Sequence, residues 1–388
     1  MQSLAQTLKE QLTGPRWTDS SLYVTEARPG RATVDGHDCL LLCSNDYLGL
    51  AGDARVVEAA ASAGRRFGFG VRASRTFMGD TTIHRELEAA LAQLKGSEAA
   101  LLFSSGFACN LGVISALAGP GDLICSDELN HASIVDGSRL SRAALAIHRH
   151  CDVSDLRAQL DQHRPDGRTL IVTESVFSMD GDLTPLPAIV ELARERQGVV
   201  ILDEAHATGV LGRAGEGLLG ALGLHGQVDV VTGTLGKALG SVGGFVAGSR
   251  DLIDFLSQRA RTFLFDTALP APAAAAALEA VRIMAAEPER VATLRHNASR
   301  LHSGLLASGY RVVRADSAIL PVEFDDPQAA RGVCEQLLEL EIVAIPVGPP
   351  HVRAGTSRIR VQASAAHTDT DVDRILTAFA AAAPNQPA

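Results

Sequence analysis

Short apolar segments that alternate with helical stretches constrain the fold more than any other feature of the sequence. Five of them lie at residues 99–103, 122–125, 170–172, 199–202 and 228–231. A strand that is apolar on both faces is typical of a parallel sheet with helices on both sides. The alternation therefore predicts an α/β fold with a mainly parallel sheet.

Polar residues follow each of these segments. They are Ser104, Ser105 and Gly106; Asn130 and His131; Glu174 and Ser178; Asp203 and His206; and Thr234 and Lys237. In open α/β sheets, ligands bind outside the carboxyl ends of the strands. We therefore expect these groups to converge on one crevice.

The length of 388 residues allows more than one domain. We predict an N-terminal segment (1–45), a large domain (46–275) and a small α+β domain (276–388). Expected elements outside the central sheet are helices at 2–12, 84–94, 328–340 and 369–382, and strands at 39–43, 318–324, 342–347 and 358–363. Residues 67–79 contain glycines and lack a clear period, which predicts a functional loop.

Charge and composition exclude several classes of partner. The net charge is −10 and no run of lysine or arginine is present, which argues against a nucleic-acid or anionic-membrane surface. We see no secretory signal and no apolar run of membrane-spanning length, so we expect a cytoplasmic protein that binds small molecules. The six cysteines form no C-x-x-C pair and are expected to be reduced and mostly buried.

Lysine is rare in this chain, which contains only Lys9, Lys95 and Lys237. We expect Lys9 and Lys95 to be solvated. Lys237 instead follows an apolar strand among glycine, alanine and leucine. Burial lowers the pKa of an amine, and a neutral amine can attack a carbonyl to form an imine. Lys237 is therefore a candidate Schiff-base lysine, with a lysine that reaches solvent from a tight turn as the alternative.

Asp203 ends an apolar strand, where a carboxylate needs a partner to stay charged. A protonated pyridine nitrogen would supply that partner, and the alternative is an Asp that caps the next turn. Gly106 and Phe107 lie where a strand enters a helix, which suits a phosphate held by backbone N–H groups, although an ordinary N-cap gives the same pattern. With the Thr234 hydroxyl, this set predicts pyridoxal phosphate (PLP).

Other functional motifs that the sequence suggests are incomplete or absent. Residues 203–206 read D-E-A-H, as in helicases, but Val231 and Ala238 stand where a phosphate loop needs Gly and Ser or Thr. No G-x-G-x-x-G follows a strand, and no G-x-S-x-G is present. His148, His150 and Cys151 lack a second ligand cluster, so we expect a solvated strand end and no metal.

Several segments together resemble the α-oxoamine synthases, PLP enzymes of the aminotransferase superfold. These enzymes condense an amino acid with an acyl thioester and release carbon dioxide. The resemblance is carried by residues 44–49, 104–110, 130–133, 174–182, 203–209, 229–244 and 358–360. It spans nearly the whole chain and implies the aspartate aminotransferase-like fold, with a smaller C-terminal α+β domain.

The family pattern implies a role for each matching residue. Lys237 would carry the cofactor and act as the base, Asp203 would pair with the pyridinium, and His131 would stack on the ring. His206 and Ser178 would contact the ring oxygen; Gly106, Phe107 and Thr234 would hold cofactor or phosphate; Asn45 and Arg360, or else Arg358, would bind the amino-acid carboxylate. The family is homodimeric with shared sites, so Thr267 would reach the partner's phosphate. Asp266 departs from the family pattern, in which serine is usual.

Two members of the family compete. Residues 181–186, 203–209 and 349–356 resemble the biotin-pathway enzyme that joins L-alanine to a pimeloyl thioester, carried by coenzyme A or an acyl-carrier protein. Residues 68–71 and 232–240 resemble the member that uses glycine and acetyl-CoA, and residues 71–75 lack glycines common to both. Arg16 is the candidate partner for the acyl carboxylate. A catalytically inactive PLP-binding protein is disfavoured because Lys237, Asp203 and His131 are all present.

Overall fold

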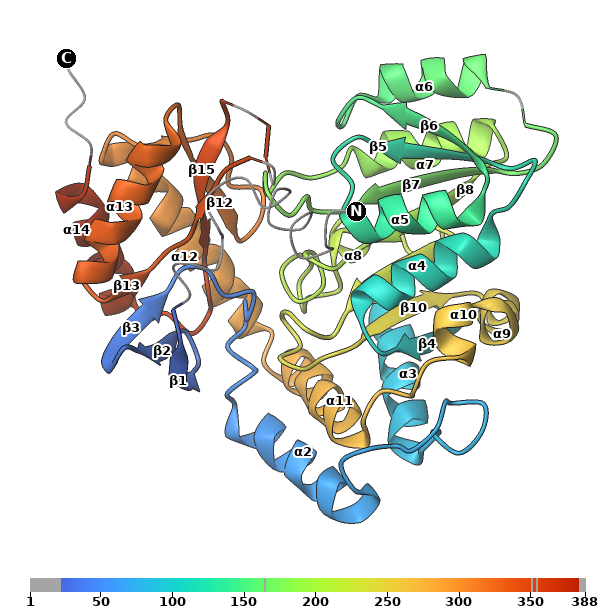
Figure 1. Cartoon of the computed structure of the whole chain (residues 1–388), viewed down its shortest axis with the longest axis horizontal. Coiled ribbons are helices and arrows are strands. Elements are labelled where there is room, and N and C mark those ends of the chain that lie inside the picture. Colours follow the sequence, from blue (N-terminus) through green and yellow to red (C-terminus); the bar gives the residue numbers. More distant parts are fainter. Residues whose placement is uncertain (1–21, 164, 350–351, 354, 384–388) are drawn as a thin grey trace, which may run out of the picture.

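The computed structural model describes residues 22–163, 165–349, 352–353 and 355–383. The predicted helix at 2–12, Lys9 and Arg16 lie outside these residues. Figure 1 shows the large sheet with its helices on one side of the molecule and the C-terminal elements with the N-terminal strands on the other.

The large sheet has seven strands in the described part of the chain. They are β4 (Ala99–Phe103), β5 (Leu123–Asp127), β6 (Ala144–His148), β7 (Thr169–Glu174), β8 (Val199–Asp203), β9 (Val230–Thr234) and β10 (Gly244–Gly248). Their order is β4-β10-β9-β8-β7-β5-β6. β10 runs antiparallel to β4 and β9, and the other four pairings of this sheet are parallel, so the prediction of a mainly parallel sheet is confirmed.

Neither β6 nor β10 is among the apolar segments from which the sheet was predicted. In β6 the side chains of Ala144, Leu145 and Ile147 are exposed, so the two-sided apolar pattern of a central strand is missing. In β10 only Phe245, Val246 and Ala247 are apolar, between two glycines. Three apolar residues are too few to distinguish a short strand from an apolar turn.

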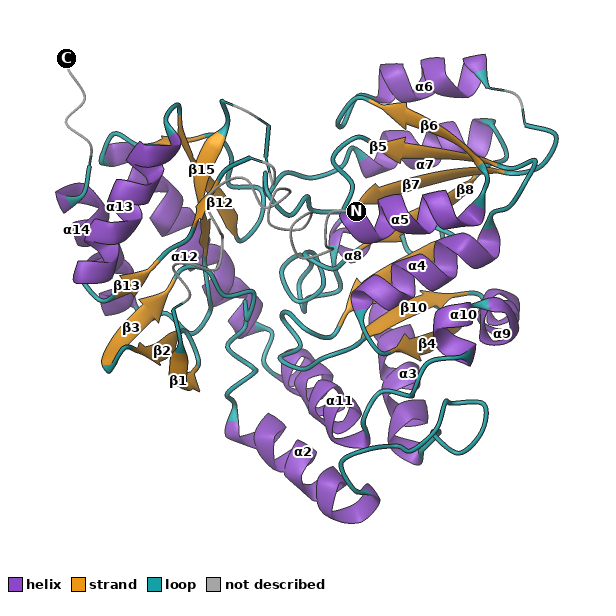
Figure 2. Ribbon diagram, in the orientation of Figure 1, coloured by secondary structure: helices purple, strands orange, loops and turns teal. Residues whose placement is uncertain are grey.

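Helices cover both faces of this sheet (Figure 2). On one face lie α4 (Gly106–Leu117), α5 (Ala132–Ser141), α9 (Arg250–Arg259) and α10 (Arg261–Leu264), whose buried side chains belong to the same core as Leu101 and Phe103 of β4. On the other lie α3 (Thr82–Lys95), α6 (Val153–Gln162), α7 (Leu186–Glu195) and the alanine-rich α11 (Ala271–Ala286), whose buried side chains belong to the same core as Ala100 and Leu102. Alternate residues of one strand thus enter two separate cores.

Helix α2 (Ala54–Phe67) packs against α11. The chain from 68 to 81 contains no helix or strand, as predicted for the glycine-bearing loop. Helix α3 then begins with a capping box formed by Thr81 and His84. Small alanine side chains in α11 let the neighbouring helices approach closely.

The C-terminal region forms a four-stranded antiparallel sheet. Its strands are β11 (Arg311–Val312), β12 (Ile319–Phe324), β14 (Pro346–Val347) and β15 (Ser357–Gln362), in the order β11-β12-β15-β14. Helices α12 (Glu289–Ala307), α13 (Pro327–Glu339) and α14 (Asp369–Ala381) pack with it. The strand predicted at 342–347 is divided between β14 and β13 (Ile342–Val343).

Strand β13 belongs to another sheet. It pairs in parallel with β3 (His37–Leu41), which continues through β2 (Arg31–Val34) to β1 (Val24–Arg28). The N-terminal strands therefore share a sheet with the C-terminal region. The boundaries at residues 45 and 275 remain a proposal.

All six cysteines are free, and four of them are buried, as predicted. Among the described residues, we find no helix that is long and apolar enough to cross a membrane.

Candidate active site

The carboxyl ends of the parallel strands enclose a cavity of about 170 Å³. It is lined by Gly106, Phe107, Asn110, His131, Ser133, Glu174, Asp203, Ala205, His206, Gly233, Thr234 and Lys237. Residues that are far apart in the sequence meet here because each follows or ends a strand of one sheet. The predicted convergence on a single crevice is confirmed.

Lys237 projects from the turn after β9, where Leu235 and Leu239 anchor the backbone in the core. Its Nζ lies 2.7 Å from His206 Nε2. Burial lowers the pKa of Lys237 below that of an ordinary lysine, although the carboxylates of Asp203 and Glu174 oppose the shift. The amine is therefore neutral at a lower pH than a solvated lysine, as a nucleophile requires.

His206 connects Lys237 to Tyr47. Burial, followed by the nearby charge of Lys237, lowers the pKa of His206 well below its ordinary value, so the ring is neutral. Its Nδ1 lies 2.8 Å from the Tyr47 hydroxyl. With Nε2 as the acceptor from Lys237, the Nδ1–H donates to Tyr47. A neutral His206 can thus accept a hydrogen bond from the Lys237 amine and orient it.

Asp203 is 6 % exposed and its two oxygens accept from different donors. Ala205 N–H donates to Oδ1 at 2.7 Å, and Asn110 Nδ2 donates to Oδ2 at 2.6 Å. Within the described residues the carboxylate forms no ion pair at salt-bridge distance. A buried carboxylate in this position favours a cationic ligand in the cavity.

A chain of hydrogen bonds links Asp203 to His131. Asn110 Nδ2 also donates to Ser133 Oγ at 3.0 Å, and Ser133 Oγ lies 2.8 Å from His131 Nδ1. Thr232 Oγ1 donates to Asn110 Oδ1 at 2.7 Å, which fixes the orientation of the amide. Burial lowers the pKa of His131, which favours a neutral ring able to lie against another aromatic ring.

Glu174 binds the backbone of the loop that carries His131. Its Oε1 accepts from His131 N–H at 2.6 Å. Burial, followed by the charge of Asp203, raises the pKa of Glu174 above its ordinary value. The backbone position of His131 is therefore tied to the end of β7.

The amino end of α4 provides a cradle for an anion. Ser105 Oγ caps the helix by accepting from Ala108 N–H at 3.0 Å, and the first turn leaves N–H groups without partners inside the helix. A Cβ at Gly106 would lie 3.1 Å from Thr234 Cβ, so a side chain there would fill the cradle. Thr234 Oγ1 donates to Gly243 O at 3.0 Å, which commits this hydroxyl to its own loop.

Four described residues to which the family pattern gives a role lie outside the lining of the cavity: Ser178, Thr267, Asn45 and Arg360. Asn45 Oδ1 accepts from the Tyr47 hydroxyl at 3.2 Å and from Arg360 Nη1 at 3.3 Å, so both residues connect to His206 through Tyr47. Ser178 contributes its backbone oxygen, which accepts from Arg360 Nε.

Arg358 and Arg360 were alternatives as ligands of the substrate carboxylate. The Arg358 side chain is 5 % exposed, and its Nη1 donates to Asp180 Oδ1 at 2.7 Å. That charge is already paired, whereas Arg360 forms no carboxylate ion pair among the described residues. The geometry supports Arg360.

Asp266 faces its own chain, where its carboxylate accepts from the Ser104 hydroxyl and from Thr267 N–H. Thr267 is exposed and is not among the described residues that line the cavity. Its assignment to a partner subunit's site stays a prediction.

Two expectations from the sequence are wrong. Lys95 is fully buried, and its Nζ binds Glu204, Thr208 and the carbonyl of Glu216. His150 is not a solvated strand end: its ring bridges Asp127 and Asp182 at 2.9 and 2.8 Å. In both cases the acceptors come from other segments of the chain, which the sequence around the residue does not reveal.

Asp127, His150 and Cys151 offer ligand atoms within 4.8 Å of one another. Burial opposes protonation of His150, but the hydrogen bonds that its ring donates to Asp127 and Asp182 dominate and raise its pKa to about 12. A protonated ring between two carboxylates donates a hydrogen bond to each of them. The arrangement is that of an ion-pair bridge between the β5–α5 and β7–α7 loops.

Sequence reasoning gave no role to Asn110, Ser133 or Tyr47, although each lies in a segment that carried the family resemblance. Asn110 and Ser133 sit inside helices, where polar residues usually face solvent. Only the structure shows that Asn110 binds Asp203 and that Ser133 connects Asn110 to His131.

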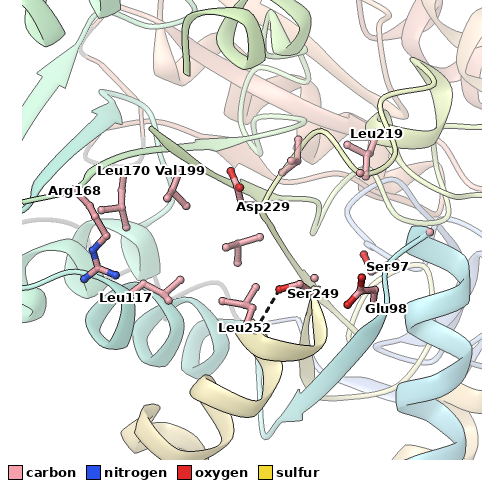
Figure 3. Close-up of a pocket in the computed structure, with 15 residues that line it drawn as sticks. Ser97, Glu98, Leu117, Arg168, Leu170, Val199, Leu219, Asp229, Ser249 and Leu252 are labelled. Carbon is pink, nitrogen blue, oxygen red and sulfur yellow. Dashed lines mark hydrogen bonds between the residues drawn. The ribbon is translucent and has the colours of Figure 1, made fainter. Parts of the chain in front are cut away.

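A second cavity, of about 490 Å³ (Figure 3), lies at the amino ends of the parallel strands, whereas the candidate active site lies at their carboxyl ends. It is bordered by the amino ends of β7, β8 and β9, and its polar groups are engaged locally. Asp229 accepts from Val200 N–H at 2.8 Å, and Glu98 accepts from Arg250 N–H at 2.9 Å. The candidate catalytic groups are all at the other edge.

Comparison with known proteins agrees with this geometry. Residues 37–379 match the model of the aminotransferase class I and II family, and the chain belongs to that family. The resemblance to the α-oxoamine synthases is also confirmed by its relatives and structural neighbours.

Among these relatives, the 8-amino-7-oxononanoate synthase of Anaeromyxobacter dehalogenans (strain 2CP-1 / ATCC BAA-258) is 50 % identical over 91 % of this chain and 89 % of its own length. The enzyme of that name from Symbiobacterium thermophilum is 45 % identical over 90 % of each chain. Serine palmitoyltransferase of Sphingomonas wittichii has a TM-score of 0.91 and 34 % identity, covering 97 % of this chain and 95 % of its own. 8-Amino-7-oxononanoate synthase of Francisella tularensis has a TM-score of 0.75 and 27 % identity, covering 88 % and 97 %.

Proposed function

We propose that this chain is a PLP-dependent acyltransferase that condenses L-alanine with a pimeloyl thioester. The products are 8-amino-7-oxononanoate, carbon dioxide and the free thiol carrier, in biotin biosynthesis. The observation that carries the proposal is the meeting of Lys237, His206 and the buried Asp203 around one cavity. When bound, PLP withdraws electrons from the amino-acid Cα.

Each residue of the site would have a separate role in the reaction. Lys237 would bind the cofactor through its neutral amine and later move the Cα proton, with its Nζ held by His206. Asp203 would keep the ring nitrogen protonated, and the Asn110 amide orients that carboxylate. The first turn of α4 would hold the phosphate, and His131 would lie against the ring.

The choice of substrates rests on the relatives. The 8-amino-7-oxononanoate synthases match about nine-tenths of this chain at up to 50 % identity, which supports L-alanine and a pimeloyl thioester over glycine and acetyl-CoA. Arg360 is the proposed ligand of the amino-acid carboxylate, and Arg16 that of the acyl carboxylate. Either coenzyme A or an acyl-carrier protein would serve as the thioester carrier.

The assembly and location are part of the same proposal. We propose a cytoplasmic homodimer that binds neither nucleic acid nor membrane, in which Thr267 reaches the cofactor phosphate of the partner. The apolar side chains of Phe77, Met78 and Phe265 are each more than 70 % exposed, which supports an interface that includes these residues.

Two measurements test the proposal. Borohydride reduction of the purified protein with PLP should label the peptide that contains Lys237, and Lys237→Ala should not be labelled. Steady-state assays should give a much higher kcat/KM for alanine with pimeloyl-CoA than for glycine with acetyl-CoA. Labelling elsewhere would refute the site, and preference for glycine and acetyl-CoA would reassign the substrates.

A further inference from the structure

The ammonium group of Lys95 lies fully buried at the end of α3, beneath the candidate site. Its Nζ donates to Glu204 Oε2 at 2.6 Å, to Thr208 Oγ1 at 2.7 Å and to Glu216 O at 2.8 Å. Three acceptors match the three N–H bonds of an ammonium, so the donor capacity of the group is satisfied. A charge this deep is retained only with such complete pairing.

Two of these acceptors lie at the two ends of one turn. Glu204 and Thr208 flank the segment whose central residue is His206, and Asp203 immediately precedes it. Within the turn, Thr208 N–H donates to Glu204 O at 2.9 Å. Lys95 therefore clamps the turn from the side opposite to the cavity.

Glu204 extends the clamp to two further elements. Its backbone N–H donates to Thr232 O at 2.8 Å, and its Oε1 accepts from Leu219 N–H at 2.9 Å. Gly217 has φ of +99°, and a Cβ there would lie 2.2 Å from Glu204 Oε2. The chain thus reserves space for this carboxylate.

We propose that Lys95 is a positioning residue, which acts through Glu204 and Thr208 to hold Asp203 and His206 against the ring nitrogen and the Lys237 amine. It does not touch the cavity itself. The inference rests on the proposed function, since those side chains matter only if PLP binds at Lys237. A clamp predicts that loss of Lys95 changes the environment of the bound cofactor, whereas a purely stabilising ion pair would change only the unfolding temperature.

The test compares the native PLP-loaded protein with Lys95→Met and with the double variant Lys95→Met/Glu204→Gln. The single variant leaves a buried carboxylate without its cation and is the one at risk of not folding. The double variant removes both charges and keeps the size of both side chains. Leu91→Ala, a buried truncation one turn earlier on α3, is the matched control for lost stability alone.

The readouts are the pH titration of the visible absorbance of PLP on Lys237 and kcat. We expect the titration midpoint of the double variant to move by at least about half a pH unit, a threefold change in the equilibrium. Its kcat should fall about tenfold or more, because small displacements of catalytic groups are costly. Leu91→Ala should lower Tm and leave both readouts unchanged.

A double variant with native midpoint and native kcat would overturn the inference and leave the proposed function intact. Failure of the double variant to fold would show that the pair serves stability, and would overturn it too. A native protein that does not bind PLP at Lys237 would instead refute the proposed function, and the inference with it.

Discussion

Replacement of Asp203 by Asn tests the partner of the ring nitrogen most directly. The exchange removes the charge and preserves the size of the side chain. A cation about 3 Å from the carboxylate gains about 5 kcal/mol at an effective dielectric constant of about 20. Ala205 N–H and Asn110 Nδ2 both donate to Asp203, and the single oxygen of an amide can accept only one of these bonds in its present geometry.

If only the electrostatic term is lost from the transition state, kcat should fall by about three to four orders of magnitude. The assay is steady-state turnover with alanine and pimeloyl-CoA, together with borohydride trapping to show that the variant still carries PLP on Lys237. Asp229→Asn is the matched control. Asp229 lines the second cavity (Figure 3) just before the amino end of β9, away from the candidate active site, so its replacement should leave kcat unchanged. Near-native kcat in a PLP-loaded Asp203→Asn protein would refute the reasoning.

Three further outcomes are expected. His150→Gln should destabilise the protein most between about pH 4 and 6.5. The pKa of His150 is raised to about 12, so the stabilisation that its charge provides declines as pH rises from 6.5 towards that value. Urea unfolding at several pH values measures this, and a loss of unfolding free energy that grows with pH would contradict it. Gly217→Ala should lower the free energy of unfolding by about 1 to 3 kcal/mol, because φ of +99° and the contact with Glu204 both resist a Cβ; an unchanged Tm would contradict the clamp geometry. Arg360→Gln should raise KM for alanine about tenfold or more. Arg358→Gln, which breaks the ion pair with Asp180, should mainly lower Tm. The reverse result would exchange the roles of the two arginines.

The sequence predicts the parallel sheet because strands buried on both faces leave uninterrupted apolar runs. It also places Lys237 and Asp203, since each directly follows or ends such a run. The position of Lys95 could not be predicted in this way: a lysine at a helix end before glycine is usually solvated, and its partner Glu204 is 109 residues away. The roles of Asn110 and Ser133 likewise depend on how α4 and α5 are oriented on the sheet.

The pairing of β3 with β13 has a consequence for synthesis of the chain. Leu40 and Leu42 make backbone hydrogen bonds to Glu341 and Val343, and Leu40 and Leu42 are fully buried. On a ribosome that adds about 5 to 20 residues per second, β3 waits about 15 to 60 s for this partner, because about 300 residues separate them. During that interval β3 presents an unpaired apolar edge. Nascent chains stalled before residue 342 should therefore depend more on chaperones than those released after it.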